Sequence, residues 1–320
     1  MSSPTHLFGR VHEAIRSSER ILLVAHKKPD GDTLGASSSF LNWLIREGKD
    51  VTIFCLDAPA PAFRYLDNVH RYTSDPSVFD KQYDTVIVFD SGDLRYCGVD
   101  QFVPRLPPGY LLVNFDHHVT NNFFGHINIV LTDASSTAEI VQRFYEENKI
   151  FVDPRMATSV LTGLLTDTGS FSNAATNPKA VEAASKMLSS GARLNDINHH
   201  LLYDKTIPAL RIWGTMLSRL SYNAKYDVVS TYMKLEDLDG VPNEVVDGAA
   251  NFLNAVTGNT DTIMMIRELP NGTVKGSFRS VTRDISKVAK LIGGGGHKKA
   301  AGFTAHGRIE VTAEGPRVVT

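Results

Sequence analysis

Short apolar runs that alternate with amphipathic segments dominate the first half of the chain. The runs occupy residues 21–26, 51–56, 84–90 and 110–116. Runs of this length without polar alternation are typical of strands buried on both faces, as in a parallel sheet with helical crossovers. Apolar residues near helical spacing predict further helices over 33–47, 156–165 and 179–188. The pattern predicts an α/β fold with a doubly wound, mostly parallel sheet.

One helix start has its own signature. Ser136 and Glu139 have the spacing of a capping box, in which Ser136 is the N-cap and Glu139 the third helical residue. The predicted helix runs through about Asn148. Further along, residues 190–222 have helical spacing without buried-strand runs, and Pro208 is expected in the first turn of a helix.

A second, smaller domain is expected near the C-terminus. Its predicted strands are 226–233, 260–269 and 273–280, and its predicted helices are about 243–254 and 284–292. Asn271-Gly272 between the last two strands is a strong hairpin signal. The sequence therefore predicts a first domain over 1–190, a helical connector over 191–214, and an α+β domain with a mostly antiparallel sheet over 215–320.

Charge is divided unevenly between these parts. The 320 residues carry 33 Lys and Arg against 35 Asp and Glu, a net charge of −2, which argues against a strongly basic protein that coats long duplex DNA. Residues 1–205 hold 19 basic and 24 acidic side chains, whereas residues 206–320 hold 14 and 11. An acidic half and a basic half are what a metal site and an anionic-substrate site require. A short anionic substrate fits this balance.

Several features of other protein classes are missing from the sequence. No apolar run reaches the roughly 18–20 residues that span a bilayer, and the polar N-terminus lacks a signal-peptide core. Cys55 and Cys97 make no disulfide framework and have no zinc-ligand spacing, and we expect Cys55 to be a buried, reduced thiol. A soluble cytoplasmic protein without a membrane partner is the expectation.

Acidic and imidazole side chains follow the apolar runs. They are His26, Asp30 and Asp32 after the first run, Asp90 at the end of the third, Asp116, His117 and His118 at the end of the fourth, and Asp167 at the end of a later apolar segment. Ligands of open α/β sheets bind beyond the carboxyl ends of the strands, so these groups should converge. A single Asp or His of this kind is more often a helix cap or a buried structural residue, but caps do not explain the whole set.

Converging carboxylates raise one another's pKa unless a cation compensates their charge. Four carboxylates and two imidazoles can serve two divalent ions with one carboxylate as a bridge. Oxygen and nitrogen ligands without thiolate favour manganese or a similar first-row ion. Two such ions form the usual clamp for in-line attack on phosphorus, and a neighbouring imidazole can protonate the leaving oxygen.

These residues resemble the motifs of the DHH phosphoesterase superfamily, in order. The motifs are His26-x-x-Pro29-Asp30-Gly31-Asp32, Asp90, Asp116-His117-His118 and Thr166-Asp167-Thr168-Gly169. The tail Gly293-Gly294-Gly295-Gly296-His297 with the following Lys298-Lys299-Ala300-Ala301-Gly302 resembles the signature of the DHH-associated C-terminal domain. Length and layout are similar to the branch of oligoribonucleases and 3′-phosphoadenosine 5′-phosphate phosphatases, the nanoRNases.

The resemblance implies a role for each matching residue. His26, Asp30 and Asp90 would hold one manganese ion, and Asp32, Asp90, His117 and Asp167 would hold the other. His118 would contact the scissile phosphate as general acid, while Asp116 would orient a neighbouring imidazole. Arg279, Gly295, Gly296 and His297 would bind substrate from the DHH-associated domain, 215–320, across a cleft to the catalytic domain, 1–190. Taken alone, the glycine run could equally be a flexible turn between a helix and a strand.

The implied function is hydrolysis of short RNA oligonucleotides to mononucleotides and removal of the 3′-phosphate from 3′-phosphoadenosine 5′-phosphate, a nucleotide bisphosphate. A phosphodiesterase for linear pApA or cyclic dinucleotides is the alternative within the superfamily. A non-catalytic RNA-binding protein is the alternative from another class, although its expected loss of ligands is not seen in this sequence. The pattern leaves a homodimer open, together with oligonucleotide length and digestion polarity.

Overall fold

The computed structural model describes residues 4–203, 207–238, 253, 260–280, 282–312 and 315–319. It divides into two compact units, Met1–Asp204 and Lys205–Thr320. The division falls within the connector that the sequence predicts over 191–214. Each unit is described by itself.

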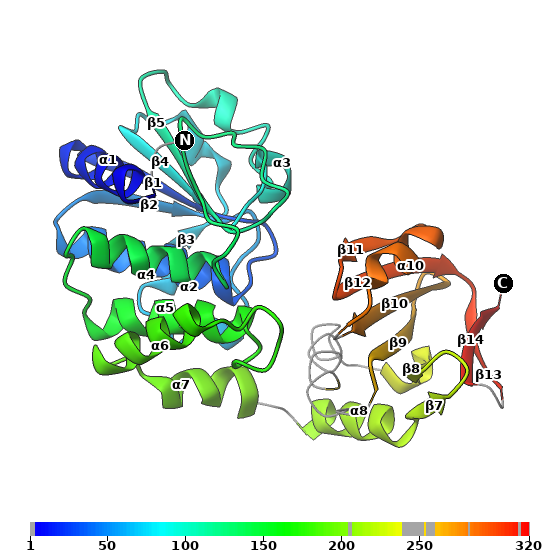
Figure 1. The fold of residues 1–320 in the computed structure, drawn as a ribbon. Helices are drawn as coiled ribbons and strands as arrows, with labels where there is room; N and C mark the ends of the chain where they lie inside the picture. Colours follow the sequence, from blue (N-terminus) through cyan, green and yellow to red (C-terminus); the bar gives the residue numbers. More distant parts are fainter. Residues whose placement is uncertain are drawn as a thin grey trace. The chain divides into compact units, whose positions relative to one another are not determined.

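The first unit is built on a six-stranded parallel sheet (Figure 1). Its strands, in the spatial order β3-β2-β1-β4-β5-β6, are β3 (Tyr72–Thr73), β2 (Asp50–Phe54), β1 (Arg20–Ala25), β4 (Thr85–Phe89), β5 (Leu111–Asp116) and β6 (Ile127–Val130). Neighbours pair in parallel throughout, for example Ile21 with Val51 on one side and with Thr85 on the other. The predicted doubly wound fold is confirmed. The strand order reverses between β1 and β4, which is where such sheets bind ligands.

Alternate side chains of the central strands enter two separate cores. Ile21, Leu23, Ile87 and Phe89 point into one core, and Leu22, Val24 and Val86 belong to the other. The first face is covered by α1 (Pro4–Ser17), α2 (Gly31–Arg46) and α4 (Thr137–Glu147), with α5 (Pro154–Asp167) and α6 (Pro178–Ser189) beyond them (Figure 1). The other face carries short elements, η3 (Pro76–Asp80), α3 (Leu94–Cys97) and η4 (Val103–Arg105). Burial on both faces explains the continuous apolar runs of these strands.

The helices predicted in this unit are confirmed, and the remaining short elements were not anticipated. The capping box forms at α4, where the Ser136 hydroxyl accepts the Glu139 N–H at 3.0 Å and the helix ends at the C-cap Asn148. Glu139 turns back to the Ser135 N–H, one residue before the N-cap. The elements not anticipated are helix α1, which has 14 residues, and the short elements η1 (Pro61–Phe63), η2 (Val69–Arg71), β3, η3, α3, η4 and β6. The short ones are two to five residues long, too short for a periodic pattern.

Two glycines allow α2 and α5 to pack closely. A Cβ on Gly35 would lie 2.5 Å from the Ser159 carbonyl oxygen and 2.8 Å from the Gly163 nitrogen. A Cβ on Gly163 would lie 2.5 Å from the Ala138 Cβ. Backbone therefore meets backbone at this crossing, and no side chain can be inserted without separating the helices.

The second unit is an α+β domain with a mostly antiparallel sheet, as predicted. Its strand order is β11 (Gly295–His297), β12 (Ala300–His306), β10 (Thr273–Ser280), β9 (Thr262–Leu269), β8 (Val228–Met233) and β7 (Ser221–Asn223). Only β8 and β9 pair in parallel among the strands described in this sheet. A separate hairpin is formed by β13 (Arg308–Thr312) and β14 (Gly315–Val319).

The loop and helix predictions for this part of the chain have mixed outcomes. The predicted hairpin forms around Pro270, Asn271 and Gly272, a three-residue loop with Gly272 at φ +70°. Helix α10 (Ile285–Leu291) confirms the prediction at 284–292, whereas the helix predicted over 243–254 lies outside the described residues apart from residue 253. The connector region contains α7 (Leu194–Asn198), a π-helical turn η5 (His199–Tyr203) and α8 (Ile207–Ser218), and a short η6 (Leu235–Leu238) follows β8.

Two further expectations concern single residues. Pro208 lies in the first turn of α8, as predicted. Cys55 and Cys97 are both free and buried, in agreement with the expected thiol at Cys55. In the part of the chain that the structure describes, no helix has the length and apolar character needed to cross a membrane.

The glycine contact between α2 and α5 gives a first testable prediction. Gly35→Ala should lower the free energy of unfolding by about 1–3 kcal/mol, because the added methyl must push backbone atoms apart. Thermal unfolding would show this as a reduced melting temperature. Gly9→Ala is the matched control: Gly9 is also inside a helix, but its Cβ would meet nothing within 4 Å, so alanine should stabilise the protein by about 0.5–1 kcal/mol. Equal effects of the two substitutions would contradict this account.

Candidate metal centre

His26 is the first residue beyond β1, and its ring orientation is fixed by the backbone. Its Nδ1 donates to the Lys27 carbonyl oxygen at 2.7 Å, which leaves the Nε2 lone pair available. Nε2 lies 3.4 Å from Asp90 Oδ2 and 3.7 Å from Asp30 Oδ1. Asp30 is also the N-cap of α2 and accepts the N–H groups of Asp32 and Thr33. These three side chains could hold one metal ion.

A second group of ligand atoms gathers around His117. Its Nε2 lies 3.3 Å from Asp167 Oδ2, 3.6 Å from Asp90 Oδ1 and 3.9 Å from Asp32 Oδ2. Asp32 comes from the first turn of α2, Asp167 ends α5, and His117 follows β5. His117 with Asp32 and Asp167 could hold a second ion, and Asp90 reaches both groups with different oxygens.

Asp90 has an unusual backbone conformation. It follows β4 directly and has φ +58°, in the left-handed region that side chains other than those of Asn, Asp and Gly rarely adopt. Its N–H donates to the Phe115 carbonyl oxygen of β5 at 2.8 Å, and the residue is 2% exposed. Strained residues of this kind persist where the surrounding structure holds them, often at functional sites.

The start of α4 holds two of these carboxylates in place. The N–H groups of Thr137 and Ala138 donate to the two oxygens of Asp32 at 2.7 and 2.8 Å. The Thr137 hydroxyl donates to Asp90 Oδ1 at 3.0 Å. The sequence predicted this helix start but not its contacts with the site. The capping box at Ser136 predicts where the free N–H groups of the first helical turn lie. Nothing in the sequence indicates which carboxylate these N–H groups bind.

His118 belongs to a separate hydrogen-bond network. Its Nδ1 donates to Asp116 Oδ1 at 2.7 Å, and the other Asp116 oxygen accepts from Asn121 Nδ2 at 2.6 Å. The Nδ1 of His118 is also 3.6 Å from Asp90, but its proton is committed to Asp116. The Nε2 atom is therefore the one that can exchange a proton with a substrate. No pattern in the sequence points to Asn121 as a site residue, because a single buried amide has no periodicity.

Burial and neighbouring charge set the pKa of His118. Burial lowers it, but the hydrogen bond to Asp116 and the charge of Asp90 outweigh burial and raise the pKa to about 9. The imidazole is therefore protonated at neutral pH, as a general acid must be.

The carboxylates show that the centre lacks compensating positive charge. Burial and the charges of Asp90 and Asp167 raise the pKa of Asp32 well above its ordinary value, and burial and Asp90 do the same for Asp167. Burial lowers the pKa of His26, but its hydrogen bonds with Asp30 and Asp90 outweigh burial and raise it to about 12. These shifts arise because several carboxylates are buried together with little positive charge beside them, so the donor set fits two divalent ions.

In the second unit, strand pairing aligns two of the predicted substrate residues. Arg279 of β10 pairs with Ala300 of β12, and Ala300 pairs with His297 of β11. Arg279 is partly buried, and the side chain of His297 lies outside the described part of the chain. The glycine run is not a simple turn, because β11 begins at Gly295. Gly296 has φ +135° and its Cβ would lie 2.6 Å from the Ala300 oxygen, whereas a Cβ on Gly295 would meet nothing within 4 Å.

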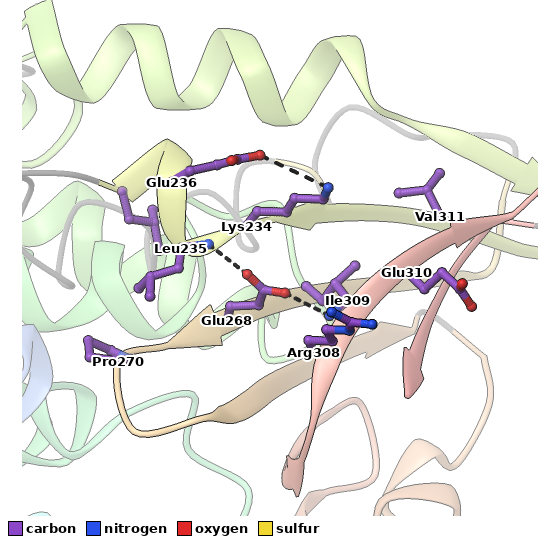
Figure 2. Close-up of a pocket in the computed structure, with 10 residues that line it drawn as sticks. Lys234, Leu235, Glu236, Glu268, Pro270, Arg308, Ile309, Glu310 and Val311 are labelled. Atoms are coloured by element: carbon purple, nitrogen blue, oxygen red, sulfur yellow. Dashed lines mark hydrogen bonds and ion pairs between the residues drawn. The ribbon is translucent and has the colours of Figure 1, made fainter. Parts of the chain in front are cut away.

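An open hollow of about 1100 Å³ in the second unit contains none of the predicted site residues (Figure 2). Glu268 lines this hollow, and its two carboxylate oxygens accept the N–H groups of Leu235 and Ile309, at 2.8 and 2.7 Å (Figure 2). This carboxylate thus joins η6 and β13 to β9. The carboxylate oxygens of Glu268 therefore stabilise the fold and do not form part of a catalytic cluster.

Comparisons with known families match both units. A model described as the DHH family, N-terminal domain, matches residues 20–164, and one described as the DHHA1 domain matches residues 227–313. The bifunctional oligoribonuclease and PAP phosphatase NrnA of Thermus thermophilus is 30% identical over 93% of this chain and 88% of its own length. The Bacillus subtilis protein of the same description is 24% identical over 90% of each chain.

The crystal structure of an exopolyphosphatase-related protein from Bacteroides fragilis shares the fold. Its TM-score is 0.86 at 22% sequence identity, and the match covers 93% of this chain and 90% of that chain.

The proton-loaded state of the centre leads to a prediction about metal binding. The raised pKa values of Asp32, Asp167 and His26 mean that the folded chain holds protons that the unfolded chain releases, so stability falls as pH rises above the ordinary values, 3.8 for the two carboxyl groups and 6.5 for His26. A divalent ion such as manganese would have to displace those protons to bind here. The increase in melting temperature caused by Mn²⁺ should therefore grow between about pH 6 and 8.

Thermal unfolding with Mn²⁺ or with a chelator at several pH values would measure this increase. Asp167→Asn should reduce it at every pH. Asp50→Asn is the control, because Asp50 is exposed and begins β2, at the opposite end of the strands. If the increase in melting temperature caused by Mn²⁺ stays constant or shrinks as pH rises, the cluster does not exchange protons for metal.

Proposed function

The chain belongs to the DHH family of phosphoesterases, a class of hydrolases, and we propose that it hydrolyses short oligoribonucleotides to mononucleotides and removes the 3′-phosphate of 3′-phosphoadenosine 5′-phosphate. The observation that carries this proposal is Asp90, whose two carboxylate oxygens lie 3.4 Å from His26 Nε2 and 3.6 Å from His117 Nε2, between the two groups of ligand atoms. The Thermus thermophilus relative, which is named for both activities, supports the choice of substrates. Because RNA fragments arise where RNA is degraded, the proposal includes a cytoplasmic location.

We assign the ligands of two divalent ions, with manganese as the proposed metal. His26, Asp30 and Asp90 would hold one, and Asp32, Asp90, His117 and Asp167 would hold the other. The oxygen and nitrogen donors suit manganese, and the described part of the site has no thiolate. When bound, such ions lower the pKa of water and offset the charge that develops on the phosphoryl oxygens.

The protein's own residues supply the proton for the leaving group. Asp116 holds the Nδ1–H of His118, so that the Nε2–H can be directed at the scissile phosphate. The hydrogen bond to Asp116 favours the protonated imidazole, so His118 can carry this proton and pass it to the departing oxygen. Thr137 keeps Asp90 in the orientation that both ligand groups share.

We further propose that the second unit binds the nucleotide through Arg279, Gly295, Gly296 and His297. The strand register that aligns Arg279 with His297 supports this assignment, as does the open space around Gly295. Within 275–299, Lys287 and Lys290 lie on the exposed face of α10, and the other five basic residues stand against Asp284 alone. A compact basic region can neutralise one or two phosphates, which suits short oligonucleotides and bisphosphates.

Direct assay tests the main proposal. The purified protein with Mn²⁺ should degrade pentaribonucleotides to mononucleotides and release phosphate from 3′-phosphoadenosine 5′-phosphate. Asp90→Asn should reduce kcat by roughly 10³-fold or more, because one neutral oxygen cannot serve both ligand groups. Asparagine also tolerates the positive φ at this position, so the fold should survive.

Asp84→Asn serves as the control, since Asp84 precedes β4 and accepts the N–H groups of Glu19 and Arg20, which an amide oxygen can also do. Intact pentanucleotides and bisphosphate would sink the proposed substrates. Hydrolysis of linear pApA or a cyclic dinucleotide alone would instead indicate the alternative phosphodiesterase, and near-normal turnover by Asp90→Asn would refute the shared ligand.

The role of Arg279 can be tested separately. Arg279→Ala should raise KM for 3′-phosphoadenosine 5′-phosphate by roughly 10- to 100-fold, the usual loss when a charged hydrogen bond is removed. Manganese binding, measured by calorimetry, should be unchanged. Lys287→Ala on the exposed face of α10 is the control and should leave KM unaltered. An unaltered KM in Arg279→Ala would remove this residue from the proposed binding site.

A further inference from the structure

One aromatic side chain beside the metal centre has no part in the functions described above. Tyr96 lies next to His26, with 5.5 Å between the ring centroids and 48° between the ring planes. Although it lies beside the buried side chain of His26, a proposed metal ligand, Tyr96 is 52% exposed. A large part of its surface is therefore open to solvent at the edge of the cluster.

The position of Tyr96 is fixed by its own short helix. The Tyr96 N–H donates to Asp93 Oδ1 at 2.6 Å. Next in the chain, Cys97 is fully buried, and its carbonyl oxygen accepts the Lys27 N–H at 3.0 Å. The helix α3 is thereby attached to the segment that follows β1, which also carries His26. A ring held in this way loses little freedom when a ligand packs against it, which favours binding.

Basic residues lie on the two segments that meet at this ring. Lys28 and Arg95 are exposed, and the Lys27 ammonium group donates to the Arg95 carbonyl oxygen. The acids that act on the ring are Asp90 and Asp30 of the cluster, whose charge the proposed metal ions would offset. An exposed aromatic ring with basic residues on the same segments is a usual feature of sites for single-stranded nucleic acid.

We propose that Tyr96 is a substrate-binding residue on which the nucleobase next to the scissile phosphate stacks. The inference rests on the proposed function, since it requires a nucleotide whose phosphate lies at the ligands His26 and Asp90. Every base has a π-face, so stacking at Tyr96 would hold nucleotides of any sequence. Lys28 and Arg95 would meet the phosphates that follow along the strand.

A purely structural role makes different demands on the side chain. If Tyr96 only shields His26 from water, leucine should replace it adequately. If the phenol hydroxyl is what matters, phenylalanine should fail. Stacking requires the ring and not the hydroxyl, so Tyr96→Phe should behave as the natural protein and Tyr96→Leu should not.

Equilibrium binding to the full-length, manganese-loaded protein tests stacking without relying on turnover. Calorimetry would compare AMP with ribose 5-phosphate, which has the same phosphate and sugar but no base. Tyr96→Leu should weaken AMP binding by roughly 5- to 100-fold and leave ribose 5-phosphate binding unchanged. Phe151→Leu is the matched control, because Phe151 is 74% exposed in the same unit, between α4 and α5, and should have no effect.

Turnover of a triribonucleotide then distinguishes the two proposals. Tyr96→Leu should raise KM with little change in kcat, while Tyr96→Phe retains both values. Equal weakening of AMP and ribose 5-phosphate, loss of manganese binding, or failure of Tyr96→Phe would overturn stacking. Base-dependent AMP binding in a protein that leaves the triribonucleotide intact would uphold stacking and refute the proposed hydrolysis.

Discussion

The confinement of several carboxylates in one small buried volume is the constraint on which the first unit depends. Asp32 is fully buried and Asp90 is 2% exposed, and both lie near Asp167 around one imidazole. Burying uncompensated charge costs several kcal/mol per ion, so such a cluster must be held by the rest of the fold. The parallel sheet meets this demand by ending β1, β4 and β5 at one edge, where their following residues share a common environment.

Close helix packing and one helix start complete that arrangement. The Cβ that Gly163 lacks would lie 2.8 Å from Asp32 Oδ1 as well as against α4, so the glycine makes room for the carboxylate. Because α5 can then approach α2, its last residue, Asp167, reaches the cluster. The N-terminus of α4 supplies two N–H groups to Asp32, and the helix dipole favours the negative charge there. The residues that determine how these helices pack therefore also determine the positions of the carboxylates in the cluster.

The sequence predicts the main strands and the proposed ligands because both have local signals. A buried strand needs a run of apolar residues, and a ligand at its carboxyl end must follow that run, as His26 and Asp90 do. Thr137, Asn121 and Tyr96 could not be found in this way. Their partners, Asp90, Asp116 and His26, are respectively 47, 5 and 70 residues away, and a single hydroxyl, amide or ring has no period. Strand β11 was missed for a related reason: its sequence is Gly295-Gly296-His297, and glycine predicts a turn.

The charge of the cluster also restricts how a phosphate can approach it. Ionised carboxylates repel a phosphodiester, and the raised pKa values of Asp32 and Asp167 show that burial and repulsion by Asp90 already disfavour negative charge there. His118 offers a positive charge, but Asp116 and Asp90 already lie beside it. The basic residues at Lys28 and Arg95 can attract an anion to the edge of the site without neutralising its centre. Divalent cations held by the proposed ligands would supply the positive charge that a phosphate needs, so their binding would convert a repulsive pocket into a phosphate site.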